Sequence, residues 1–163
     1  MFVRPTTRTD IPAVDALLAR SYPVLLKPDY VSSVLVTAVP LICKAQPVLV
    51  CCGTYYGVFD GNVLVGAGGW TIKPPGGSHR AEGVAHIRHV VTDPQRVRQG
   101  IGQLMMNHVF AQAQSAGVKR LMCQSTRTAV PFYQAAGFER LNEIEVPLAQ
   151  GVKFPAVQMM RDF

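Results

Sequence analysis

The sequence has no long hydrophobic run and no cysteine motif. No stretch of its 163 residues approaches the ~20 apolar residues that span a bilayer, and the opening MFVRPTTRTD is not a signal peptide. The cysteines form no CxxC pair and have no histidine nearby at zinc-ligand spacing. These absences predict a cytoplasmic protein with no membrane partner and no metal, whose cysteines are reduced core thiols. The cysteines are Cys43, Cys51, Cys52 and Cys123.

Acidic residues are also scarce, with 10 Asp and Glu against 16 Lys and Arg and a net charge of +6. The whole excess lies in residues 73–127, which hold two acidic side chains, Glu82 and Asp93, and eight basic ones. Clustered positive charge concentrates phosphates, so this window indicates a polyanion site unless it is only a solvated basic face. No basic tail, basic repeat or recognition-helix pattern accompanies it, so no nucleic-acid partner is expected. The basic residues are Lys73, Arg80, Arg88, Arg96, Arg98, Lys119, Arg120 and Arg127.

The hydrophobic periodicity predicts the element order β-α-α-β-β-β-α-β-α-β-β, with no internal repeat and no linker. Asp10 can cap the first helix, and Pro40 is expected to bend or end the second. Glycines 66, 68 and 69 indicate a bulge or a close neighbour in the second strand of the predicted hairpin at residues 54–72. The predicted strands are 2–5, two strands within 54–72 joined at Asp60-Gly61-Asn62, 84–92, 120–125, 139–146 and 154–162. The predicted helices are 10 to about 20, 30–43, 101–116 and 128–138.

The stretch RVRQGIGQLMM, residues 96–106, places two glycines directly before a helix. The first N–H groups of a helix lack internal partners, and the helix dipole favours an anion there. Gly100 and Gly102 would let the backbone approach phosphates without an intervening Cβ, although the same pattern also occurs in simple tight turns. The chain contains no Gly-Lys pair, which excludes a P-loop, and Met105 replaces the third glycine of the dinucleotide-binding fingerprint.

A second motif, PFYQAAGF at residues 131–138, follows after one helix and one strand. Together the two segments resemble the GCN5-related N-acetyltransferase (GNAT) superfamily. In that family Val-x-Pro-x-x-[Arg/Gln]-x-x-Gly-x-Gly/Ala leads from a strand into a helix, and Tyr-x-x-x-Gly-Phe comes later. The resemblance implies an α/β (α+β) fold with a central mixed, mostly antiparallel sheet of about seven strands flanked by four helices. It also implies one acetyltransferase domain over residues 1–163.

The resemblance implies acetyl-CoA as cosubstrate, with its pantetheine arm between strands 84–92 and 120–125. Val90 and Val91 would donate main-chain hydrogen bonds to it, and Ser125 and Thr126 stand near the asparagine of many relatives. The sequence departs from the family pattern at Val97, where Arg or Gln is usual, and at Thr92, where Val is usual. Val97 removes a side-chain contact but leaves the main-chain cradle. The cradle residues are Arg98, Gln99, Gly100, Ile101, Gly102 and Gln103.

The chemistry implied is direct attack of a primary amine on the thioester, which needs a proton acceptor and a donor for the departing thiolate. Tyr133 occupies the family's tyrosine position and is the predicted acid, because a phenol is protonated at neutral pH. His86 stands where several relatives carry a strand carboxylate, and it is expected to share a strand face with Arg88 but not with His89. Glu82 or a chain of water molecules are the alternatives to His86 as the base.

The acceptor amine is not identified by the sequence. Tyr22, Tyr30 and Trp70 are candidates for its pocket, and few acidic residues are available to hold a polyamine or aminoglycoside. The enzyme reading has one close alternative, a non-catalytic module of the same fold that binds acetyl-CoA or CoA. Both a monomer and a homodimer are compatible with the apolar C-terminal segment FPAVQMMRDF.

Overall fold

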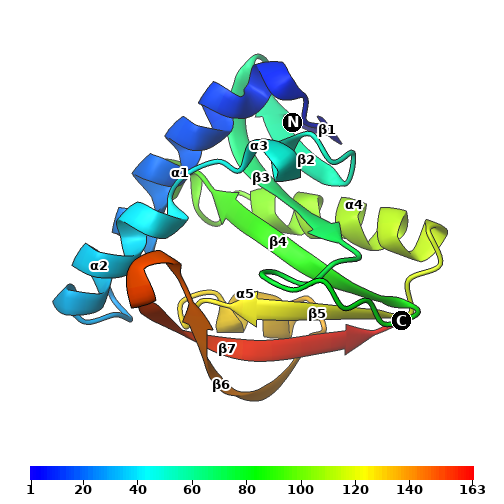
Figure 1. Cartoon of the computed structure of the whole chain (residues 1–163). Coiled ribbons are helices and arrows are strands. Elements are labelled where there is room, and N and C mark those ends of the chain that lie inside the picture. Colours follow the sequence, from blue (N-terminus) through cyan, green and yellow to red (C-terminus); the bar gives the residue numbers. More distant parts are fainter.

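A seven-stranded sheet runs through the computed structural model, which describes all residues from 1 to 163 (Figure 1). The strands lie in the order β1-β2-β3-β4-β5-β7-β6, and only the β4–β5 pair is parallel. This confirms the predicted mixed, mostly antiparallel sheet. The strands are β1 (Phe2–Pro5), β2 (Tyr55–Asp60), β3 (Val63–Thr71), β4 (Val84–Thr92), β5 (Arg120–Ser125), β6 (Glu139–Pro147) and β7 (Lys153–Asp162).

Helices cover both faces of the sheet and bury separate apolar clusters against it. On one face Met105, Met106 and Val109 pack with Tyr133 in the largest cluster. On the other face Val14, Leu17 and Leu18 pack on the first half of the sheet. Both faces are therefore apolar, and β2 and β3 are buried along nearly their whole length. The α-helices are α1 (Ile11–Leu25), α2 (Ser32–Ile42), α3 (Pro47–Val50), α4 (Ile101–Ser115) and α5 (Val130–Ala135).

The first half of the chain departs from the predicted helices in three places. α1 continues beyond Arg20 because Leu18, Tyr22 and Leu25 prolong its apolar stripe. α2 passes through Pro40, which has no N–H to donate to the carbonyl of Val36. Val36 is 73% exposed, so water can replace the missing hydrogen bond. The short α3 was not predicted, and it buries Leu49 and Val50.

The parallel strands β4 and β5 stay paired only at their starts. Val84, Ala85 and His86 pair with Arg120, Leu121 and Met122, and the pairing stops there. α4 makes the crossover between these strands, so its first turn lies at the end where they are no longer hydrogen-bonded to each other. A sheet open at this point exposes main-chain groups and side chains of both strands.

A bulge interrupts β4 just after this separation, opposite the glycines of β3, for which a bulge or a close neighbour was predicted. Arg88 pairs with Gly69 and Val91 with Ala67, so His89 and Val90 together lie opposite Gly68. A Cβ on Gly68 would lie 2.8 Å from Cγ2 of Val90, which explains why glycine is needed there. His89 has a φ of 44°, which lies in the left-handed region, as expected for a bulged residue held by its neighbours. Its carbonyl accepts a hydrogen bond of 3.0 Å from the Tyr55 hydroxyl.

Candidate functional site

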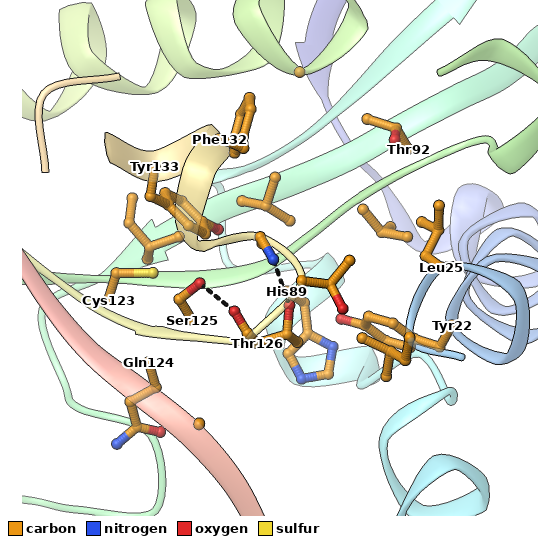
Figure 2. Close-up of a pocket in the computed structure, with 18 of the residues that line it drawn as sticks. Tyr22, Leu25, His89, Thr92, Cys123, Gln124, Ser125, Thr126, Phe132 and Tyr133 are labelled. Atoms are coloured by element: carbon orange, nitrogen blue, oxygen red, sulfur yellow. Dashed lines mark hydrogen bonds between the residues drawn. The ribbon is translucent and has the colours of Figure 1, made fainter. Parts of the chain in front are cut away.

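A cavity of about 1030 Å³ opens where β4 and β5 separate (Figure 2). Its walls come from residues 87–92 of β4, from residues 123–126 at the end of β5, and from the starts of α4 and α5. One further wall is formed by α1 and by the β6–β7 hairpin. This volume is at the upper end of the ~300–1,000 Å³ that is usual for small-molecule sites, so the cavity can take a large ligand.

The start of α4 offers free main-chain donors to one end of the cavity. The first main-chain hydrogen bond of the helix runs from Leu104 N–H to the Gly100 carbonyl at 2.9 Å, so Ile101, Gly102 and Gln103 have N–H groups without helical partners. Arg98 and Gly100 have φ values of 62° and 79°, which turn the chain tightly into the helix. This arrangement suits an anion, and the exposed Arg98 has no acidic partner. Of the six predicted cradle residues, Gln99 alone does not line the cavity.

Glycine is favoured at positions 100 and 102 for different structural reasons. A Cβ on Gly100 would meet no protein atom within 4 Å, so only its positive φ and the cavity constrain it. A Cβ on Gly102 would lie 2.8 Å from Cε2 of Phe132. The expectation that both glycines clear space for a ligand therefore fits Gly100, whereas Gly102 makes room for an aromatic ring of α5.

Tyr133 lies in the cavity wall and is only 5% exposed (Figure 2). Its ring makes edge contacts with Phe132 and Phe138, with centroids 5.2 and 5.3 Å away. Burial, reinforced by the neighbouring Cys123, raises the pKa of Tyr133 well above its ordinary value. The phenol therefore keeps its proton across the physiological range and is available as a donor.

The cysteines are all free, as predicted, but only one of them is fully buried. Cys123 is 3% exposed, and burial raises the pKa of its thiol to about 12, so it is not a nucleophile at neutral pH. Cys51 and Cys52 are exposed, so the expectation of core thiols was wrong for these two, whereas Cys43 is half-buried and packs against the cluster that α2 forms with β7.

The hydroxyls of Ser125 and Thr126 are engaged within the loop that follows β5. Ser125 donates to the Thr126 carbonyl at 2.7 Å, and the Thr126 hydroxyl accepts from the Ala129 N–H at 3.2 Å (Figure 2). Both residues line the cavity, but these bonds hold the entry into α5. Thr128, which the sequence did not single out, also lines the cavity, and its buried hydroxyl has no protein partner. An unpaired polar atom of this kind suits a ligand that offers a hydrogen bond.

The bulge lies where β4 forms a wall of the cavity. Arg88, His89, Val90 and Val91 all line it, and the register shift interrupts the regular alternation of β4 between Arg88 and Val91. His86 instead lies in an adjoining recess of about 190 Å³, which shares four residues with the main cavity, namely Pro75, Ile87, Cys123 and Gln124. Glu82 lines neither space.

Both histidines of this region are neutral at pH 7. Burial, and then the nearby Arg88, lowers the pKa of His86 below 6.5 and that of His89 to about 4. The Nε2 atom of His89 lies 3.3 Å from Nε2 of Gln46. An amide nitrogen only donates, so the His89 Nε2 accepts this bond and its ring proton resides on Nδ1.

Of the aromatic residues predicted for the acceptor pocket, only Tyr22 lines the cavity (Figure 2). Tyr30 instead donates to the Pro155 carbonyl at 2.7 Å and accepts from the Arg127 N–H at 2.8 Å. Trp70 is buried in the core. No group of three or more metal-binding side chains occurs, and no helix is long and apolar enough to cross a membrane.

The chain is similar to known acetyltransferases in sequence and in fold. Residues 19–138 match the Acetyltransferase (GNAT) family. Over 105 residues the chain is 30% identical to the uncharacterized N-acetyltransferase YjcF of Bacillus subtilis, a match that covers 64% of this chain and 67% of the relative.

Two solved structures show the same fold at low sequence identity. A GCN5-related N-acetyltransferase from Rhodopseudomonas palustris superposes with a TM-score of 0.79 at 17% identity, over 99% of this chain and 95% of that one. The PaiA N-acetyltransferase from Thermoplasma acidophilum, solved in complex with coenzyme A, gives a TM-score of 0.73 at 12% identity, over 99% and 98%. Both likenesses extend across the whole sheet and its helices.

Proposed function

Because the chain belongs to the GNAT family of acetyltransferases, and is therefore an acyltransferase, we propose that residues 1–163 form one domain that transfers an acetyl group from acetyl-CoA to a primary amine. The observation that carries this proposal is the opening of one cavity onto two features. One is the set of free N–H groups at the start of α4, and the other is the protonated hydroxyl of Tyr133. The first suits a pyrophosphate and the second suits a leaving thiolate.

The residues present fit acetyl-CoA along the length of the cavity. The N–H groups of Ile101, Gly102 and Gln103, with the Arg98 guanidinium, would hold the pyrophosphate. Val90 and Val91, in the part of β4 that does not pair with β5, would orient the pantetheine arm and the thioester through their main chain. Thr128 offers a further unpaired hydroxyl. Acetyl-CoA supplies an acyl group already activated as a thioester, so the protein needs no nucleophile of its own.

The remaining task of the protein is to move two protons. Tyr133 donates one toward the sulfur as the thiolate departs. The proton lost by the amine passes through cavity water to His86 in the adjoining recess. His86 is neutral at pH 7 and can accept it. His89 suits this role less, since its Nε2 already accepts a hydrogen bond and its pKa of about 4 makes it a weak base. The free cysteines suit a reducing compartment, and we place the protein in the cytoplasm on that ground.

Calorimetric titration with acetyl-CoA, CoA and ATP tests the cofactor assignment directly. We expect roughly micromolar dissociation constants for acetyl-CoA and CoA and much weaker binding of ATP, at both low and moderate salt. Release of the CoA thiol is then followed with a panel of primary amines. Thiol release that depends on the amine identifies the enzyme. Tight CoA binding without any such release would instead identify a non-catalytic CoA-binding module, and no CoA binding would refute the proposal.

A further inference from the structure

The end of the cavity away from α4 is an apolar chamber, and Arg88 of β4 also lines the cavity. Its apolar walls come from α1, α2 and the β6–β7 hairpin, and they include Tyr22, Leu25, Leu26, Ile42, Val146 and Leu148. Not one Asp or Glu lines the cavity at any point. A chamber without a carboxylate is unsuited to a polycationic acceptor, because nothing would balance the charges that such a ligand brings.

Arg88 differs from every other partly buried arginine of this protein. Arg4 is paired with Asp10 at 2.8 Å and Arg96 with Asp60 at 2.6 Å. Arg161 donates to the Ala136 carbonyl at 2.7 Å and lies 4.0 Å from the centre of the Phe110 ring. Arg88 makes a single side-chain hydrogen bond, 3.1 Å to the Thr71 hydroxyl, and has no acidic partner. Four of its five N–H donors are therefore left for solvent or for a ligand.

The surroundings of Arg88 supply no negative charge either. The titratable side chains that interact electrostatically with Arg88 are His86, His89, Tyr55 and Cys52, and both histidines are neutral at pH 7. Partial burial lowers the pKa of Arg88 from its ordinary value, which reflects a guanidinium that is losing water without gaining a counter-ion. Because a bidentate carboxylate is the ligand that a guanidinium fork fits best, the missing partner of Arg88 has an obvious chemical identity.

We propose that the acceptor of this enzyme is a small amine that also carries a carboxylate and an apolar side chain, as an apolar α-amino acid does, and that Arg88 binds its carboxylate. The inference rests on the proposed acetyl transfer and names its substrate class. Arg88 immediately precedes the bulged residues His89 and Val90, so an acceptor held by Arg88 is held beside the strand segment that orients the thioester. The apolar side chain of the acceptor contacts the walls supplied by α1 and the β6–β7 hairpin.

Matched ligands test this assignment by calorimetry, with and without saturating CoA. The probes are L-phenylalanine, L-phenylalaninamide, which replaces only the carboxylate, and 2-phenylethylamine, which lacks it. We expect the acid to bind the CoA-saturated protein at least about tenfold more tightly than the amide, the range of one charge-assisted hydrogen bond. Arg88→Gln should erase that difference and Arg88→Lys should keep part of it. Arg96→Gln, which removes a positive charge from another residue that lines the cavity, should leave the ratio of acid to amide unchanged.

The outcomes separate this inference from the proposed function. Equal binding of acid and amide, binding of neither at about 10 mM, or a preference for the acid that survives in Arg88→Gln would each overturn the role of Arg88. If CoA still binds and an amine from the wider panel is still acetylated in those cases, the proposed function stands without it. Absence of CoA binding refutes the proposed function, and the probes measured without CoA then still report on Arg88. Thermal unfolding of each variant verifies that it is folded.

Discussion

The two left-handed glycines at opposite ends of α4 allow a controlled test of the phosphate cradle. Gly100 precedes the helix with a φ of 79° and Gly117 follows it with a φ of 84°. A Cβ on either residue would meet no protein atom within 4 Å. The two positions therefore carry the same backbone constraint and the same steric freedom, but only Gly100 lines the cavity.

Replacing each glycine by leucine should cost the fold a similar amount. A left-handed conformation costs an L-residue about 1–2 kcal/mol, and neither variant creates a clash that would add to this. We expect urea denaturation to show nearly equal losses in the free energy of unfolding for Gly100→Leu and Gly117→Leu. Gly117 closes the C-terminus of α4, where its N–H donates to the Gln114 carbonyl at 3.0 Å, and that bond does not depend on the side chain.

Cofactor affinity should separate the two variants. A leucine at position 100 obstructs the N–H groups of Ile101 and Gly102, and each hydrogen bond to a charged group is worth about 1.5–3 kcal/mol. The loss of two such bonds raises the dissociation constant of CoA at least about 100-fold. Gly117→Leu should bind CoA like the unmodified protein in the same calorimetric assay. A folded Gly100→Leu protein that binds CoA within about threefold of the unmodified value would refute the backbone cradle.

Three further predictions concern the proton donor, the proton acceptor and stability. Tyr133→Phe keeps the buried ring, so CoA affinity should be unchanged while turnover falls roughly 100-fold. The control is Tyr56→Phe, which changes a buried tyrosine outside the cavity. Equal turnover in the unmodified protein and both variants would remove Tyr133 as the acid. His86→Gln should lower turnover by a similar factor. Since the pKa of His86 is lowered, the unmodified enzyme should lose activity on acidification only below pH 6.5. Unchanged turnover in His86→Gln would leave water as the sole proton acceptor. The Asp10 carboxylate, which accepts bonds of 2.8 and 2.9 Å from Arg4, has a pKa lowered from 3.8 to about 2. The contribution of this carboxylate to the free energy of unfolding is present above pH 3.8 and is lost as the pH falls through 2. Asp10→Asn should therefore lower the free energy of unfolding, measured by urea denaturation, by about 1–2 kcal/mol at pH 7 and by progressively less below pH 4. A loss that does not depend on pH would contradict the ion pair.

Local patterns in the sequence were sufficient for most elements of the sheet and for the cofactor loop. The residues 84–92 and 120–125 were predicted as strands with the bounds that the structure has. The hairpin turn after Asp60 was also predicted correctly, because a turn residue pattern acts over a few neighbouring positions. The helix ends in the first half were predicted less well, since Pro23 and Pro40 interrupt a local pattern while tertiary burial of Leu26, Ala38 and Val39 maintains the helices.

The sequence by itself determined the family motifs, the glycine loop, the position of Tyr133 and the concentration of positive charge, because each of these depends on residues adjacent in the chain or on composition. Only the tertiary structure decided which of the positive charges that line the cavity have an acidic partner. Arg96 is paired with Asp60, a residue 36 positions away in sequence, whereas Arg88 is left unpaired. The bulge after Arg88 arises from packing between strands, where Val90 occupies the space over Gly68 and the Tyr55 hydroxyl holds the His89 carbonyl. The glycines of β3 indicate a bulge or a close neighbour, but which strand carries the extra residue depends on how β3 and β4 pack, and this cannot be inferred from one strand.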